Sequence, residues 1–215
     1  MTRKGCVELL RERLQKIYHE KNSDLPFHGW HHITFVTKKA IAFANSIDAN
    51  IFLVESAALV HDLNYVVRPN SESVDGKELR QKILFEIGYT QEEIDTIEVI
   101  IQESSTEVRD ENISNEGKAL SDADTLFKSL PLTPVIFASK YMTENKINIH
   151  QLVRKIISEQ SPLLERGIYF YTELAKEKYL NWAKLNLDLW NRVNEALMDE
   201  DVKEMLDTAK KLGAI

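Results

Sequence analysis

The sequence predicts an all-α fold, and three observations lead to that prediction. The 215 residues include only 7 Gly and 5 Pro. These two turn-forming residue types make up roughly 12% of a typical chain, so this sequence has less than half of their usual share. Hydrophobic residues make up 43% of the chain, which is enough for a core. They recur every three or four residues, as on one face of a helix. We therefore expect a single compact helical bundle with additional C-terminal helices.

Apolar residues at helical spacing predict each helix of the first half of the chain. Such stretches run over residues 7–18, from about 28–30 to 46, through 52–63, from 75 to about 88, and from 90 to 101. Two helix starts resemble capping boxes, in which a first residue and one three positions later satisfy each other's backbone amides. These pairs are Asp75 with Glu78 and Thr90 with Glu93, and Gly88 is expected to end the helix between them.

The second half reads as a loop followed by more helices. Residues 105–116 are polar and predict a loop, and a short helix over 120–130 is expected to end at Pro131. The pairs Thr133-Pro134 and Ser161-Pro162 are typical of helix starts, because Pro fits the first turn. A long amphipathic helix and a final segment over 201–212 follow. Without repeats or a linker, we expect one domain over 1–215, with its core at about 25–130 and helices 131–215 packed on it.

Charge and cysteine content exclude several classes of protein. The formal net charge is −7 and no basic stripe is visible, so a nucleic-acid polymer is not an expected partner. A small phosphorylated ligand remains compatible with this net charge, because one or two well-placed basic side chains are enough to bind it. The single Cys6, the charged N-terminal segment and the lack of an apolar run of about 20 residues predict a cytoplasmic protein outside membranes.

The most informative pair of residues is His61-Asp62, which lies in an apolar segment that we expect to be buried. Burying an imidazole beside a carboxylate costs several kcal/mol unless something compensates both groups. A divalent cation would do so, because Asp oxygen and neutral His nitrogen are its natural ligands. The pair therefore predicts a metal site whose remaining ligands lie elsewhere in the chain.

Two further segments carry residues that could complete this site. One contains His28, His31 and His32, and the other contains Asp122 and Asp124. Each has an ordinary alternative: His28 and His32, four apart, could be a surface pair, and Asp122 could cap a helix. His31 could simply be exposed.

Taken together, the order His, His-Asp, Asp resembles the HD-domain superfamily of metal-dependent phosphohydrolases. His32 precedes His61 by 29 residues, and Asp124 follows Asp62 by 62, intervals similar to those of the family. The segment His-Gly-Trp-His-His is similar to the His-Asp-Trp-x-His opening of one bacterial subfamily. The likeness covers roughly residues 25–130 and implies an HD-type helical bundle.

The resemblance also implies roles for individual residues. It makes the chain a hydrolase of a nucleotide or another small phosphate ester, with one divalent ion (Mn, Mg, Co, Ni, Zn or Fe). Asp62 would orient the attacking water. The implied metal ligands are His32, His61, Asp62 and Asp124.

The sequence leaves the group that protonates the leaving oxygen open, with His28, His31, Glu55 and Lys77 as candidates in falling order. Independently of the resemblance, Lys77 and Arg80 would reach a phosphate if the helix that starts at Asp75 borders the pocket, with an ordinary solvated helix face as the alternative. His31 is a further candidate substrate contact.

Two departures from the family pattern keep other functions open. Asn64 stands where the subfamily has Gly, and residues 101–106 lack a His that relatives often carry there. The missing His favours one metal ion over two, and so disfavours oxygen chemistry at a pair of irons. An HD-fold metal- and nucleotide-binding regulatory module with little or no turnover is the alternative function. A homodimer is compatible with the sequence.

Overall fold

The protein is all-helical, as predicted. The computed structural model describes residues 2–106 and 109–214, and the regular structure in these two ranges consists of helices alone. In chain order they are α1 (Arg3–Glu20), α2 (Trp30–Ser46), α3 (Ile51–Val60), α4 (Leu63–Val67), η1 (Ser73–Gly76), α5 (Lys77–Ile87), α6 (Gln91–Ser104), α7 (Asn115–Ser129), η3 (Thr133–Phe137), α8 (Ala138–Asn145), α9 (Ile149–Glu165), α10 (Glu173–Met198) and α11 (Glu200–Lys211).

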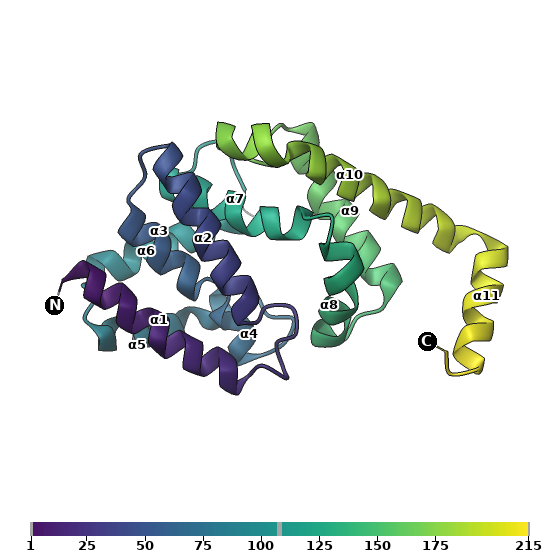
Figure 1. Ribbon diagram of the computed structural model, residues 1–215, viewed down its shortest axis with the longest axis horizontal. Coiled ribbons are helices and arrows are strands. Elements are labelled where there is room, and N and C mark those ends of the chain that lie inside the picture. The colour runs from purple at the N-terminus through teal and green to yellow at the C-terminus, as the bar shows by residue number, and fades with distance from the viewer. Residues whose placement is uncertain (1, 107–108, 215) are drawn as a thin grey trace.

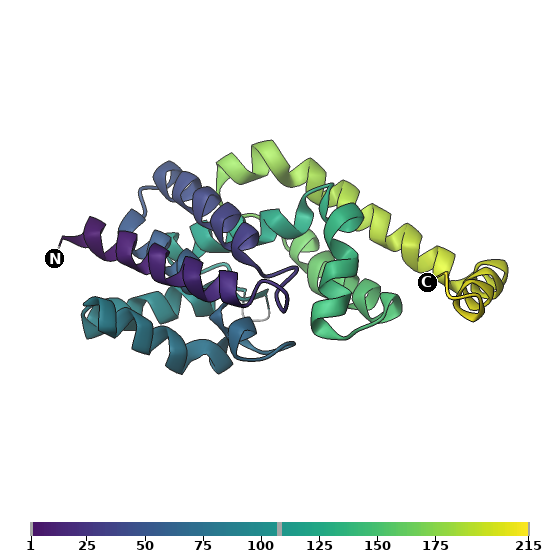
Figure 2. The ribbon, with the colours of Figure 1, turned by 60° about the horizontal axis from the view of Figure 1, so that its bottom comes forward.

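Helix α7 lies at the centre of the arrangement. It packs against α2, α3 and α6 on one side, and α10 crosses it on the other. In both views the group α1–α6 occupies one end of the molecule, whereas α11 projects at the opposite end (Figures 1 and 2). Helices α8 and α9 stand between them beside the end of α7 (Figure 1). Residues of α7 can therefore face both groups of helices.

Two clusters of buried apolar side chains hold these groups together. The larger contains residues from Cys6 in α1 to Ala183 in α10, so the first helix and the late helices both contribute to it. The smaller contains Leu152, Val153, Trp190 and Leu197, and joins α9 to α10. Within the described residues no helix is both long and apolar enough to cross a bilayer.

Helix capping confirms one expected start and corrects another. Thr90 and Glu93 form the predicted capping box at α6, and Gly88 ends α5 with φ 107°, a left-handed conformation that suits Gly. Asp75 instead completes a capping box with Glu72 one turn earlier, at the start of η1. Its carboxylate accepts from the Glu72 amide and from Arg68, so it is not available to cap α5.

Proline positions also differ from the prediction at one place. Pro134 does lie in the first turn of η3, but Pro162 lies inside α9 rather than at a helix start. Helix α9 begins at a capping box of Asn148 with Gln151 and ends at Glu165. Pro162 cannot donate a backbone hydrogen bond within α9, and it lies in the last turn of the helix, which ends at Glu165. The short helix expected over 120–130 begins earlier, at Asn115, and the loop before it is correspondingly shorter.

Candidate functional site

The His61-Asp62 pair lies where two helices meet. Helix α3 ends at Val60, His61 still has helical angles, and Asp62 departs from them with φ −101° and ψ 17°. Helix α4 then begins at Leu63. The prediction placed both residues inside one continuous helix, and the structure corrects this. The break directs both side chains out of the apolar packing of α3 toward α2 and α7.

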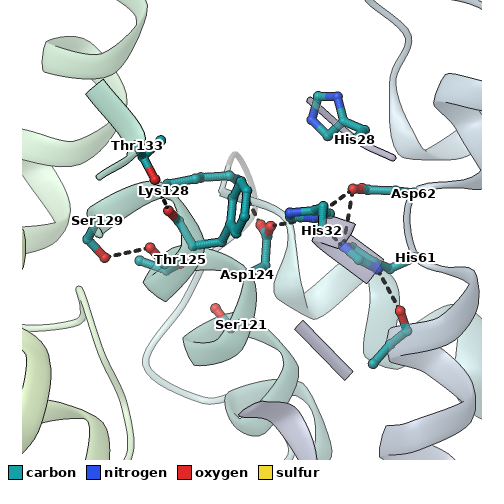
Figure 3. A network of polar contacts seen from close by, with 12 residues as sticks. His28, His32, His61, Asp62, Ser121, Asp124, Thr125, Lys128, Ser129 and Thr133 are labelled. Carbon is teal, nitrogen blue, oxygen red and sulfur yellow. Dashed lines mark hydrogen bonds and ion pairs between the residues drawn. The ribbon is translucent and has the colours of Figure 1, made fainter. Parts of the chain in front are cut away.

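Three ligand-type side chains converge there, as the sequence predicts. Nε2 of His32 lies 3.3 Å from Nε2 of His61 and 3.0 Å from Oδ2 of Asp62. His61 Nε2 and Asp62 Oδ2 are also 3.3 Å apart. Figure 3 shows Asp124 approaching His32 from the opposite side, with its Oδ1 at 3.6 Å from Nε2 of His32.

These separations suit a shared metal ion. Ligand atoms about 2.1 Å from one ion lie about 3.0 Å apart at an octahedral angle and about 3.4 Å apart at a tetrahedral angle. The buried Oδ2 of Asp62 makes no well-aligned hydrogen bond among the described residues and faces the two imidazole nitrogens at 3.0 and 3.3 Å. Such an oxygen beside two imidazole nitrogens calls for a positive charge. The residues His32, His61 and Asp62 therefore fit a divalent cation, and they could hold one.

The protonation states of the cluster point the same way. Nδ1 of His61 lies 2.8 Å from the Ala58 carbonyl oxygen and donates to it, which leaves the Nε2 lone pair facing the cluster. Burial lowers the pKa of His61, which favours the neutral ring that a metal requires. Burial alone would raise the pKa of Asp62, but the adjacent His61 and His32 lower it, so it stays ionised.

Asp124 connects this cluster to a lysine. One helical turn later in α7, Nζ of Lys128 lies 2.7 Å from Oδ2 of Asp124. Although burial opposes ionisation of the carboxyl group, the ammonium of Lys128 lowers the pKa of Asp124. The two oxygens of Asp124 thus face different partners, one toward His32 and the other toward Lys128 (Figure 3).

The cluster opens onto a cleft of about 220 Å³, many times the room that one water molecule needs. His61, Asp62 and Asp124 lie on one wall, together with the loop 71–73. The other wall consists of Tyr141 in α8 and one face of α9. The cleft therefore lies between the two groups of helices, with α7 at its base.

His28 also lines this cleft, and its ring is fixed on two sides. Its Nδ1 is hydrogen-bonded to Glu144 of α8, and its ring stacks on Tyr65 with centroids 3.5 Å apart. The second oxygen of Glu144 accepts from the backbone amides of Phe27 and His28, at 2.8 and 3.1 Å. The ring is therefore held with Nε2 as the nitrogen left free of Glu144.

The structure does not bring the other predicted substrate contacts into the cleft. Lys77 is exposed. His31 is also exposed, and its ring stacks on that of Phe137 with the ring centroids 5.2 Å apart. Arg80 is buried, and its guanidinium donates two hydrogen bonds to Glu98, at 2.9 and 2.6 Å. It also donates to the Ser73 carbonyl at 2.8 Å, so it supports the loop that borders the cleft.

Asp122 has a different task from the helix cap that its sequence position allows. It lies within α7, whose first residue is capped by Ser114 instead. Its carboxylate accepts from the Tyr171 amide at 2.7 Å and from the amide and hydroxyl of Thr172, at 2.8 and 2.7 Å. Burial raises the pKa of Asp122 to about 6, against these hydrogen bonds. Asp122 thus ties the start of α10 to α7.

Both departures from the family pattern lie at the cleft. Asn64 is buried and donates to the Ser71 carbonyl and hydroxyl, at 3.2 and 3.0 Å, which holds the loop at the cleft edge. The segment without a His presents Ser104, Ser105 and Thr106 to the cleft instead. Among the described residues, the one group of His, Cys, Asp or Glu side chains close enough together to hold a metal ion consists of His32, His61 and Asp62.

Sequence reasoning missed three charged residues of the cleft region. Glu144 lies 116 residues from His28 and carries no local signal. Lys128 could have been found, because it follows Asp124 by four residues and so shares its helix face. Lys155 lies on the face of α9 that lines the cleft, but only the packing of α9 against α10 identifies that face.

Comparison with known proteins places the chain beside one bacterial protein. No family model matches the sequence. The uncharacterized protein YpgQ of Bacillus subtilis (strain 168) is 35% identical over 124 residues. That stretch is 56% of this chain and 58% of YpgQ, so the matched sequence spans little more than half of the relative.

Solved structures resemble the chain over nearly its whole length. The crystal structure of Bacillus subtilis YpgQ in complex with ADP has a TM-score of 0.60 and 23% identity, and the match covers 94% of this chain and 100% of YpgQ. The Lin1889 protein from Listeria innocua has a TM-score of 0.58 and 19% identity, over 93% and 97% of the two chains. At these identities the likeness shows a common fold.

Proposed function

We propose that the chain is an HD-type metal-dependent phosphohydrolase that acts on a nucleotide or another small phosphate ester. The observation that carries this proposal is the convergence of His32, His61 and Asp62, of which His61 and Asp62 line a cleft together with the neighbouring Asp124. The order of these residues in the sequence matches the HD pattern. The ADP complex of YpgQ, a protein of the same fold, supports a nucleotide as the ligand.

His32, His61, Asp62 and Asp124 would hold one divalent cation. When bound, such an ion lowers the pKa of a coordinated water and screens the charge on a phosphoryl group. Asp62, which is ionised and lines the cleft, would orient the attacking water. Lys128 adds a positive charge beside Asp124, where phosphoryl oxygens would collect negative charge.

His28 is the proposed source of the proton for the leaving oxygen. Its Nδ1 is occupied by Glu144, so Nε2 is the nitrogen that can exchange a proton with a ligand in the cleft. Tyr65 stacks on the ring and prevents it from turning away. Phosphoryl transfer depends mainly on positioning and charge stabilisation. His28 as a fixed proton donor, together with the bound metal ion and the ammonium of Lys128, would therefore supply what the reaction requires.

The test is hydrolysis of a nucleotide and phosphate-ester panel after loading with Mn, Co, Ni, Mg or Zn. We expect His61→Ala and Asp124→Ala to lower kcat by more than about 100-fold, since even residues behind the ligands cost 10–100-fold. His19→Ala, an exposed histidine in α1, is the matched control and should retain full activity. Absence of phosphoester hydrolysis by the metal-loaded protein would disprove the proposal.

A regulatory module that binds nucleotide without turnover is the second candidate. The hydroxyl groups of Ser104, Ser105 and Thr106 at the cleft, where relatives often carry a His, favour it. The same panel separates the two functions. Nucleotide binding with no product formed under any of the five metals would favour the module.

A further inference from the structure

Helix α10 carries a row of large apolar side chains on its surface. Trp182, Leu185 and Leu189 remain 38%, 58% and 43% exposed. The buried face of the same helix contains Trp190, which lines the cleft, so the row lies on a different face from the proposed site. Helix α10 runs along one edge of the molecule in both views, where a partner can approach it (Figures 1 and 2).

The spacing of this row is typical of two helices that pair along their length. Trp182, Leu185 and Leu189 are three and four residues apart, and the exposed Arg192 and Ala196 continue the alternation of three and four. In coiled coils this alternation forms the line of contact between helices. Exposed apolar residues that are scattered singly are ordinary on a monomer, whereas a row on one helix face indicates an interaction surface.

The residues of the row complement a second copy of the same helix. When two copies of α10 run antiparallel and cross between Leu185 and Leu189, each Leu185 meets the partner's Leu189. Each Arg192 then meets the partner's Trp182, and a guanidinium over an indole face is a favourable cation–π contact. In a parallel pair the two Arg192 side chains would meet and repel each other. Charge therefore selects the antiparallel arrangement.

Charges beside the row agree with the same register. Arg192 is held on the surface by ion pairs, with its Nε 3.8 Å from Oδ1 of Asp188 and its Nη1 2.9 Å from Oε2 of Glu195. In the antiparallel pair Lys178, four residues before Trp182, falls beside the partner's Glu195. A basic end of each helix thus meets an acidic end of the other.

We propose that the chain forms a homodimer through antiparallel pairing of α10 with α10 of a second copy. The interface is symmetric, so each of these contacts occurs twice. Pairing over residues 178–196 covers about 27 Å of helix, at 1.5 Å per residue. A single helix pair of this length is at the small end of specific interfaces, so the dimer is reversible rather than obligate.

The first test is sedimentation velocity of the full chain across micromolar concentrations, where we expect monomer and dimer in equilibrium. Leu185→Glu should raise the dissociation constant at least about 100-fold, because it places two unpaired carboxylates in an apolar contact. Arg192→Gln should raise it about tenfold, because two cation–π contacts are lost. Leu9→Glu, at a leucine 44% exposed in α1, is the matched control and should dimerise as the wild type does.

The second test is disulfide trapping, which reads the register and uses substitutions at exposed positions that leave the fold intact. Under mild oxidation, a mixture of Leu185→Cys and Leu189→Cys chains should cross-link much more than either variant alone. The native Cys6 is buried in α1 and is common to both chains.

Each outcome decides the inference independently of the proposed function, since neither test uses a nucleotide or a metal ion. A chain that stays monomeric at every concentration, or a dimer that survives Leu185→Glu, would overturn the α10 interface. Preferential cross-linking of Leu185→Cys with itself would indicate a parallel pair and would also overturn it.

Discussion

Glu144 shows how a single side chain can join two distant parts of this protein. It lies on α8, and its carboxylate accepts hydrogen bonds from the Phe27 and His28 amides and from the His28 ring. All these groups are buried. Both carboxylate oxygens are used as acceptors, so the loop before α2 and the ring of His28 depend on one residue.

We expect Glu144→Ala to lower the free energy of unfolding by about 2–4 kcal/mol, because it leaves buried donors unpaired. Glu144→Gln should also destabilise, since an amide offers one acceptor oxygen where two are needed. Urea unfolding measures both, with Glu177→Ala, an exposed residue of α10, as the control. Wild-type stability of Glu144→Gln would show that one oxygen is sufficient.

At the scale of residues, the sequence predicted the cluster better than its surroundings. His32, His61 and Asp62 could be found because each is a ligand-type residue in an apolar helical context. The ring contacts of His28 could not, because Glu144 and Tyr65 come from other elements. Lys77 and Arg80 were expected to reach a phosphate, yet the direction of α5 exposes the first and pairs the second with Glu98.

Among the elements, the tie between α7 and α10 shapes the cleft. Helix α7 carries Asp124 and Lys128 on one face, and Asp122 binds the start of α10. Thr172 caps α10 by accepting from the Ala175 amide, while its hydroxyl donates to Asp122. The position of α10, which packs on α9, is therefore set partly by Asp122.

We expect Asp122→Ala to cost about 1–3 kcal/mol of stability, since the Thr172 and Tyr171 donors lose their acceptor. The cost of burying the carboxyl group is relieved at the same time, which keeps the loss in this range. Thermal unfolding gives the value, and Asp95→Ala, at an exposed position of α6, is the control. Equal melting temperatures for Asp122→Ala and the wild type would mean that the tie does not hold α10.

Helices were predictable where local signals act alone. The Thr90 capping box and the Gly88 end needed no tertiary contact, and both are present. The start at Pro162 was wrong because α9 already begins at Asn148, whose capping box with Gln151 outweighs the later proline. The break at Asp62 was also missed, because the apolar pattern continues through it from α3 to α4.

For the whole molecule, the cleft depends on both groups of helices. The main core includes side chains from α1 through α10, which leads us to retain the proposal of one domain. The smaller cluster around Trp190 holds α9 against α10, and α9 supplies the wall opposite the metal-type residues. A ligand that spans the cleft would contact both groups at once.

Metal binding should therefore stabilise the entire fold. At a Mn²⁺ concentration of about 100 times Kd, binding to the folded state alone adds about 2.7 kcal/mol. For a chain of this length that corresponds to roughly 5–10 °C in melting temperature. His61→Ala should abolish most of the shift, and His19→Ala should preserve it. A shift of the same size in His61→Ala would place the stabilising ion elsewhere, because the convergence of His32, His61 and Asp62 requires all three side chains.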